Sequence, residues 1–261
     1  GLGGYECGVK TRLPLIQPSW QGVNKARQKS STDQPSKEQQ AAKLINQGKL
    51  QEAETIYREL ITAGTTNHIT YANLGAICLM QGNFDKSISL LQKAIDFKAN
   101  YPEAHNNLGI ALKELGNLNT AIASYNKALE LNPNYPEAHY NLGNALQEQG
   151  DLTAAITSYN SALQLKPNYP DAHNNLGNAL KKQGDLTAAI ASYNSALQLK
   201  PNYPEALLGT LTVIEDGRGL DDLKVKIRRA ADFDQNILNN PQYVELIASL
   251  GGKFMREILS S

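Results

Sequence analysis

Residues 136–169 read PEAHYNLGNALQEQGDLTAAITSYNSALQLKPNY, and residues 170–203 read PDAHNNLGNALKKQGDLTAAIASYNSALQLKPNY. The two stretches differ at only five of 34 positions. Residues 102–135 differ from the second stretch at ten positions, and residues 68–101 and 34–67 continue the same frame with more divergence. A fixed period of this length indicates a repeat protein, in which each unit buries its apolar face against its neighbours. The chain therefore carries five tandem repeats.

Each repeat is expected to form two antiparallel helices. We number positions within a repeat from its first residue, so that Pro136 is position 1. Proline at this position suits the first turn of a helix, because a backbone N–H there has no acceptor within the helix and its absence removes no hydrogen bond. A glycine at position 15, such as Gly150, is typical of a helix end. The second helix carries Ala155 and Tyr159 at helical spacing and stops before Pro167.

Small and large residues complement one another between the two helices. Position 8 is glycine in four of the five repeats and allows a close approach, while tyrosine at position 24 fills the gap. In the first repeat, Ala41 replaces the glycine. In the second, Ser87, Leu91 and Ala99 replace the expected alanine, aromatic residue and proline. We expect these two repeats to be less regular but to keep the same fold.

This pattern resembles the tetratricopeptide repeat, whose signature runs from Leu-Gly near the start to Ala, an aromatic residue, Ala and Pro. The matching residues of the fourth repeat are Leu142, Gly143, Ala155, Tyr159, Ala162 and Pro167. The resemblance implies an all-α fold: a right-handed superhelical solenoid of antiparallel helix pairs. It also implies a non-catalytic scaffold that binds a peptide or protein segment in the concave groove lined by the first helices.

Two further regions flank the repeats. Residues 1–33 carry five basic and two acidic side chains and are interpreted as a basic arm or linker. The charge excess either steers an acidic partner or belongs to a solvated tail. Residues 204–261 are interpreted as a degenerate sixth repeat and a helical capping tail, because the apolar stripe continues through Leu207 and Leu211 while the Leu-Gly pair is lost. Solenoids need such caps at their ends.

The composition argues against nucleic-acid binding, membrane insertion and a disulfide scaffold. The 261 residues carry 25 basic and 25 acidic side chains, so binding of nucleic acid through phosphate neutralisation is disfavoured. No stretch approaches the ~20 apolar residues that cross a bilayer, so we expect no membrane insertion. The two cysteines, Cys7 and Cys78, do not form a disulfide scaffold, and we predict a reducing, cytoplasmic location.

The sequence lacks the common motifs for catalysis or metal binding. It contains no G-x-S-x-G, G-x-x-x-x-G-K-[ST], H-E-x-x-H or C-x-x-C pattern. His105, His139 and His173 recur at position 4, one per repeat, which spaces them as a ladder rather than a metal cluster. Cys78 occupies an apolar position and is expected to be a core thiol. We therefore predict that the chain is no enzyme and has no metal and no cofactor.

A binding surface remains as the candidate for function. The near-identical repeats differ mainly on one stripe of the first helix, at positions 2, 5 and 12, and position 9 changes from Ile110 to Asn144 and Asn178. These positions share one helix face, which the spacing places away from the core. The variation reflects either selected recognition or the drift of a solvated face. In tetratricopeptide proteins this stripe lines the groove where extended peptides bind.

Position 6 carries an asparagine in four consecutive repeats. A side-chain amide offers both a donor and an acceptor, so it can pair with a peptide main chain whatever the ligand's side chains are. The candidate peptide-binding groove comprises this ladder and the adjacent stripe residues: Asn73, Asn106, Asn107, Ile110, Lys113, Tyr140, Asn141, Asn144, Gln147, Asn174, Asn175, Asn178 and Lys181.

Other hypotheses for the partner stay open. The run PNYPDAHNNLGNAL at residues 167–180 looks like the repeats that precede the transferase domain in O-GlcNAc-transferase-like proteins, where an asparagine ladder holds the substrate backbone. The chain would then be the substrate-targeting part of a larger transferase. Service as an assembly factor for a membrane complex, and self-association through the terminal repeats, are further alternatives. The carboxylate clamp of chaperone cofactors needs Lys or Arg at positions 2 and 6, which this chain lacks, so an acidic chaperone C-terminus is disfavoured.

Overall fold

The computed structural model describes residues 36–215, and every regular element in that range is an α-helix. The chain divides into two compact units, Gly1–Pro133 and Asn134–Ser261. Unit 1 contains α1 (Lys37–Asn46), α2 (Leu50–Thr62), α3 (His68–Met80), α4 (Phe84–Phe97), α5 (Pro102–Glu114) and α6 (Leu118–Leu131). Unit 2 contains α7 (Pro136–Gln149), α8 (Leu152–Leu165), α9 (Pro170–Gln183), α10 (Leu186–Leu199) and α11 (Pro204–Glu215).

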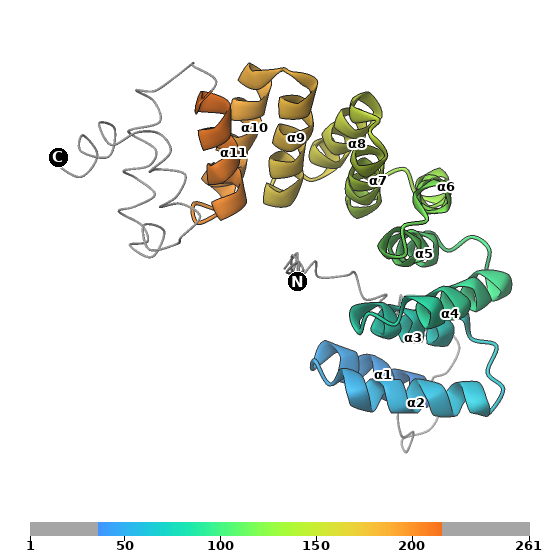
Figure 1. Cartoon of the computed structure of the whole chain (residues 1–261). Helices are drawn as coiled ribbons and strands as arrows, with labels where there is room; N and C mark the ends of the chain where they lie inside the picture. The colour runs from blue at the N-terminus through green and yellow to red at the C-terminus, as the bar shows by residue number, and fades with distance from the viewer. Residues whose placement is uncertain (1–35, 216–261) are drawn as a thin grey trace, which may run out of the picture. The chain divides into compact units, whose positions relative to one another are not determined.

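Within each unit, helices pack in chain order. The first helix of each repeat packs against the second, and the second packs against the first helix of the next repeat, as α3, α4 and α5 do in unit 1 and α7, α8 and α9 do in unit 2 (Figure 1). This arrangement confirms the predicted all-α fold of consecutive helix pairs. The basic arm and most of the capping tail lie outside the described residues, and the exact division into repeats stays our interpretation.

Local sequence explains where the helices start and stop. Ser36 and Gln39 form a capping box before α1, and Asp151 accepts a hydrogen bond from the backbone N–H of Ala154 at the start of α8. Proline opens α5, α7 and α9, as position 1 predicts. Gly150 and Gly184 follow the first helices with φ of 95° and 94°, a left-handed conformation that disfavours any side chain with a Cβ.

The glycine at position 8 and the tyrosine at position 24 hold each helix pair together. A Cβ added at Gly143 would lie 2.6 Å from Cε1 of Tyr159, and one added at Gly177 would lie 2.7 Å from Cε1 of Tyr193. Both tyrosines have no exposed surface. The ring therefore occupies the volume that a larger residue at position 8 would need, which confirms the predicted complementarity.

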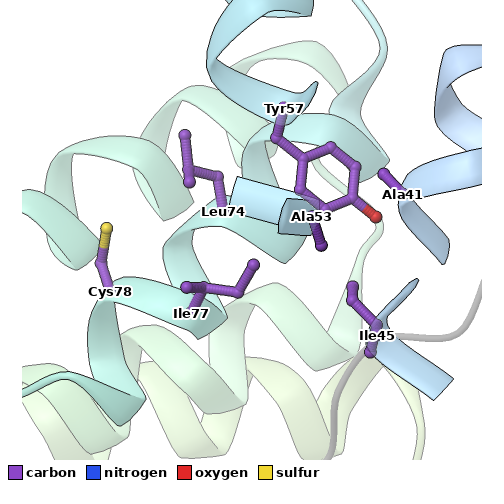
Figure 2. Packing of buried hydrophobic residues seen from close by; sticks show 7 residues of the cluster. All are labelled: Ala41, Ile45, Ala53, Tyr57, Leu74, Ile77 and Cys78. Carbon is purple, nitrogen blue, oxygen red and sulfur yellow. The ribbon is translucent and has the colours of Figure 1, made fainter. Parts of the chain in front are cut away.

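The two divergent repeats pack their helix pairs with other residues at positions 8 and 24. In the second repeat Leu91 replaces tyrosine and lies against Gly75, while the Ser87 hydroxyl donates a hydrogen bond of 2.8 Å to the Gly75 carbonyl. In the first repeat Ala41 and Tyr57 are buried in one cluster with residues of α3, as Figure 2 shows. Both repeats keep the helix-pair fold, as the sequence predicts.

Candidate peptide-binding stripe

The predicted groove residues lie on the first helices α3, α5, α7 and α9, and we call positions 5, 6, 9 and 12 of these helices the first-helix stripe. Position 5 is buried at Asn106, Tyr140 and Asn174. The expectation that the whole stripe lies away from the core is therefore wrong at this position. The reason is visible at Tyr140, whose ring packs against the rings of Tyr159 and Tyr169, with centroids 6.1 and 4.9 Å away. The periodicity of one helix does not reveal contacts with Tyr159 of α8 or with Tyr169, the N-cap residue of α9.

Position 6 differs between the units. Asn73 and Asn107 in unit 1 have no exposed surface, whereas Asn141 and Asn175 in unit 2 are half-buried. Asn175 donates from Nδ2 to the Tyr140 hydroxyl at 3.1 Å and to Oδ1 of Asn144 at 2.8 Å. The asparagine of one repeat is thus tied to the first helix of the repeat before it. In unit 2 this links the predicted ladder to the stabilisation of the fold.

Position 9 in unit 2 carries amides whose oxygen atoms are already paired. The Tyr159 hydroxyl donates to Oδ1 of Asn144 at 2.8 Å, and the Tyr193 hydroxyl donates to Oδ1 of Asn178 at 2.7 Å. Tyr159 also lies 3.2 Å from Oε1 of Gln147 at position 12. Within the described residues, the NH₂ groups of Gln147 and Asn178 have no acceptor. The same tyrosine that packs the helix pair therefore orients an amide donor on the stripe.

Tyrosine ionisation is suppressed around this network. Burial raises the pKa of Tyr159 and of Tyr140 above the ordinary tyrosine value, and hydrogen bonds with Asn144 and Asn175 oppose this shift at Tyr140. Burial also raises the pKa of Tyr193 to about 12. The hydroxyls are therefore protonated at neutral pH and act as donors to the amide oxygens.

Three charged side chains on and beside the unit 2 stripe have partners inside the chain. Glu137 forms an ion pair with Lys166 at 3.0 Å, and Asp171 accepts a hydrogen bond of 2.7 Å from the Tyr203 hydroxyl. Lys181 at position 12 donates to the Thr212 hydroxyl of α11 at 2.9 Å. Position 12 thus adds further donor capacity, because an ammonium has three N–H groups and no acceptor. In unit 1, Lys113 at this position pairs with Glu114.

Three buried amide atoms of the stripe lack a hydrogen-bond partner: Oδ1 of Asn73, Nδ2 of Asn107 and Oδ1 of Asn174. The other half of each amide is engaged. Nδ2 of Asn73 donates to the Tyr57 hydroxyl at 2.9 Å, and Nδ2 of Asn174 donates to Oδ1 of Asn175 at 3.1 Å. Buried polar atoms are nearly always paired, so these three are exceptions, and they lie beneath the surface of the stripe rather than on it.

Two of the histidines lie close to backbone carbonyls, and the cysteine of α3 lies in the core. A ring nitrogen of His105 lies 3.1 Å from the Ala99 carbonyl, and one of His173 lies 3.0 Å from the Pro167 carbonyl. Cys78 is fully buried, as predicted, and burial raises the pKa of its thiol. In the described range there is no group of three His, Cys, Asp or Glu residues that could hold a metal ion.

Stacked helix pairs with a glycine–tyrosine contact at positions 8 and 24 define a helical repeat protein. Sequence models of the TPR repeat match residues 75–116, 111–150 and 143–184, and a model of the tetratricopeptide repeat matches residues 170–203. The chain belongs to the tetratricopeptide repeat (TPR) proteins. No curated protein matches the chain in sequence.

Solved structures of TPR proteins share the fold. MamA is 25% identical with a TM-score of 0.56, and the alignment covers 62% of this chain and 94% of MamA. PilF of Pseudomonas aeruginosa is 17% identical with a TM-score of 0.69, covering 82% and 96% of the two chains. YrrB, described as a TPR protein with an unusual peptide-binding site, is 21% identical with a TM-score of 0.56, covering 66% and 89%. The likeness to PilF and YrrB is one of fold.

The family sets the general class of function. TPR proteins are protein-interaction scaffolds, and the TPR fold is generally a non-catalytic module. Among the described residues, no helix is long and apolar enough to cross a membrane. The resemblance to O-GlcNAc-transferase-like repeats, the transferase-targeting alternative, the cytoplasmic location and self-association stay predictions.

Proposed function

We propose that the first-helix stripe of unit 2 binds an extended protein segment through that segment's main chain. The observation that carries the proposal is the fixed orientation of the stripe amides, because Tyr193 engages Oδ1 of Asn178 and Tyr159 lies against Oε1 of Gln147. Each NH₂ group is then held as a donor toward a ligand carbonyl. Ordering the donor before binding lowers the entropic cost of association.

Lys181 supports the same reading. It lies about one helical turn after Asn178 on α9, so the helix carries the Asn178 NH₂ group and the Lys181 ammonium as donors on one face. A peptide main chain offers a complementary C=O at each residue. Main-chain recognition of this kind tolerates many ligand sequences, and contacts with the ligand's side chains supply discrimination.

The test replaces the donor while keeping the fold. In Asn178→Asp the carboxylate still accepts the Tyr193 hydroxyl hydrogen bond, but the outward NH₂ donor becomes an acceptor. Peptides would be selected from a random 12-residue display library with the wild-type chain, and their affinities would be measured by fluorescence anisotropy. We expect a loss of roughly 1–3 kcal/mol because a ligand carbonyl is left unpaired, which is about 5- to 150-fold in affinity.

The matched control is Asn160→Asp, which makes the same change on an exposed position of α8. It should leave the selected peptides bound as tightly as before. Asn107 is unsuitable for this test because it has no exposed surface and its replacement would alter folding. Selected peptides that bind Asn178→Asp as tightly as wild type would place the binding surface elsewhere, on the second helices or the C-terminal tail.

A further inference from the structure

The second helices of unit 2 differ in charge from those of unit 1. Helices α8 and α10 contain no Asp, Glu, Lys or Arg, and their sequences differ only at Thr157 and Ala191. In unit 1, α2, α4 and α6 each carry at least one basic and one acidic side chain. Charged residues normally make up about 25–35% of a protein surface and are depleted at the centre of an interface. Two neighbouring helices without any charge are therefore typical of an interface.

These helices are open to solvent in the structure. Both pack against α9 (Figure 1) and expose the same positions, 22, 29 and 30 among them. Equivalent helices of stacked repeats are related by a small rotation, so these positions lie on one surface. We call this surface the uncharged face, and it comprises Thr157, Gln164 and Leu165 of α8 and Ala191, Gln198 and Leu199 of α10. Its two leucines are 40% and 38% exposed.

Hydroxyl groups on and beside the uncharged face donate to the backbone of their own helix. The Thr157 hydroxyl donates to the Thr153 carbonyl at 3.0 Å, and the Ser161 hydroxyl donates to the Thr157 carbonyl at 3.1 Å. On α10, the Ser195 hydroxyl donates to the Ala191 carbonyl at 3.1 Å. Because these donors are already satisfied within the helix, covering them with a partner leaves no donor unpaired. Removing water from this face therefore costs less than its polar residues suggest.

The charged residues that border the two helices are engaged inside the chain. Asp151 and Asp185, directly before the helices, each accept a hydrogen bond of 3.0 Å from a backbone N–H and so cap them. Lys166 and Lys200, directly after the helices, lie over tyrosine rings at 4.5 and 4.1 Å from the ring centroids. The uncharged face thus has a charged border whose groups already have partners.

The chemistry of the uncharged face is complementary to itself. Gln164 and Gln198 each end in an amide, which is both donor and acceptor and can pair with another amide through two hydrogen bonds. A charged partner finds no opposite charge on this face, whereas a second copy of the face meets it without repulsion. Because α8 and α10 are nearly identical, a two-fold axis between two copies makes the same α8–α10 contact twice.

We propose that two copies of the chain associate through the uncharged face, with α8 of each copy against α10 of the other. Leu165 and Leu199 leave water in this contact, and their burial is the favourable term. The first-helix stripe lies on α7 and α9, so this proposal does not depend on peptide binding there.

The test introduces like charges into the contact. The variant Thr157→Glu, Ala191→Glu adds a carboxylate to each helix at an exposed position, and Thr157→Lys, Ala191→Lys adds an ammonium group to each. In sedimentation velocity, the mass of the full-length wild type should rise with concentration toward 57 kDa, twice the 28.5 kDa of one chain. Each variant alone should need at least about tenfold higher concentration to associate, because like charges face one another. An equimolar mixture of the two variants should associate again, because opposite charges then meet.

The matched control is Ser89→Glu, Ala123→Glu, which makes the same change at position 22 of α4 and α6, where both residues are exposed. It should associate as the wild type does, and circular dichroism should show the same helical content in all variants. A wild type that keeps the mass of one chain up to about 10⁻⁴ M would overturn the proposal and leave the face to a different protein. Association that persists in both charged variants would place the contact elsewhere. Charged variants that dissociate but do not associate when mixed would overturn the pairing of α8 with α10.

Discussion

Tyrosine at position 24 does two things in unit 2. Its ring fills the space beside the position-8 glycine, so that the two helices of a repeat touch through Gly143 and Tyr159 without a Cβ between them. The hydroxyl at the far end of the same ring donates a hydrogen bond to the side-chain oxygen of the position-9 asparagine. One buried side chain therefore couples the packing of a helix pair to the orientation of a group on the candidate binding stripe.

The glycine–tyrosine contact predicts a large effect from a small substitution. Gly143→Val should destabilise the chain by roughly 1–3 kcal/mol, because the new side chain overlaps a fully buried ring that has no room to move. Thr157→Val, a β-branched substitution on the exposed surface of α8, should stay within about 0.5 kcal/mol of wild type. Urea denaturation followed by circular dichroism measures both. Equal midpoints for the two variants would contradict the contact.

Buried tyrosines also predict alkaline instability. Burial raises the pKa of Tyr57 and Tyr193 from 10 to about 12, so the folded chain holds these protons more tightly than the unfolded chain does. Their stabilising contribution is therefore complete below pH 10 and is lost as the pH rises from 10 through 12, at about 2–3 kcal/mol for each residue.

The measurement for this prediction is urea denaturation at pH 8 and at pH 11.5, with Tyr193→Phe as the matched variant. The variant cannot ionise at this position, so it should lose less stability than wild type between the two pH values. A wild type whose midpoint does not move between pH 8 and pH 11.5 would show that the tyrosines are not protected in the folded state.

At the scale of the helix, the sequence predicts what recurs in every repeat and misses contacts made by a residue that only one repeat carries. Period, helix pairs, glycine ends and the position-8 contact all follow from residues that repeat in phase. The burial of Tyr140 does not, because only the fourth repeat has tyrosine at position 5, where it packs against Tyr159 and Tyr169 of the same repeat. The Tyr193–Asn178 hydrogen bond does have a signal in the sequence, because asparagine at position 9 occurs only in repeats with tyrosine at position 24.

At the scale of the helix we also expect the effect of a core substitution on the free energy of unfolding to vary along the repeats. Tyr159→Ala should cost more than Tyr57→Ala, because Tyr159 lies in one of the two near-identical repeats while the first repeat is divergent and near an end of the array. Both rings are fully buried, and truncation of a buried aromatic residue costs ~3–5 kcal/mol, with less where the site relaxes. Denaturant melts of the two variants provide the comparison. Equal losses, or a greater loss for Tyr57→Ala, would count against nearest-neighbour stabilisation.

At the scale of the whole molecule, charge is nearly balanced in the repeats, and the opposite net charges of the two flanking regions offset one another. Residues 34–203 carry thirteen basic and fourteen acidic side chains, residues 1–33 have a net charge of +3, and residues 204–261 have a net charge of −2. Several lysines of the repeats are engaged locally: Lys37 pairs with Glu59, and Lys200 lies over the Tyr203 ring at 4.1 Å from its centroid. Such engaged cations leave little positive field for a polyanion.

This balance predicts weak binding of nucleic acid. Binding of a random-sequence RNA depends on releasing counterions from several neutralised phosphates, and only the five basic residues of the N-terminal region provide a local excess. The dissociation constant of a random 20-nucleotide RNA, measured by fluorescence anisotropy at about 150 mM salt, should therefore be no tighter than about 10⁻⁶ M. Glu148→Lys, which gives α7 the charge that Lys182 gives α9, should strengthen binding only slightly, because one added cation neutralises about one phosphate. A submicromolar complex of the wild type that weakens steeply between 50 and 200 mM salt would contradict this prediction. It would show that the lysines act together on a phosphate backbone, and that the chain is an RNA-binding protein as well as a scaffold.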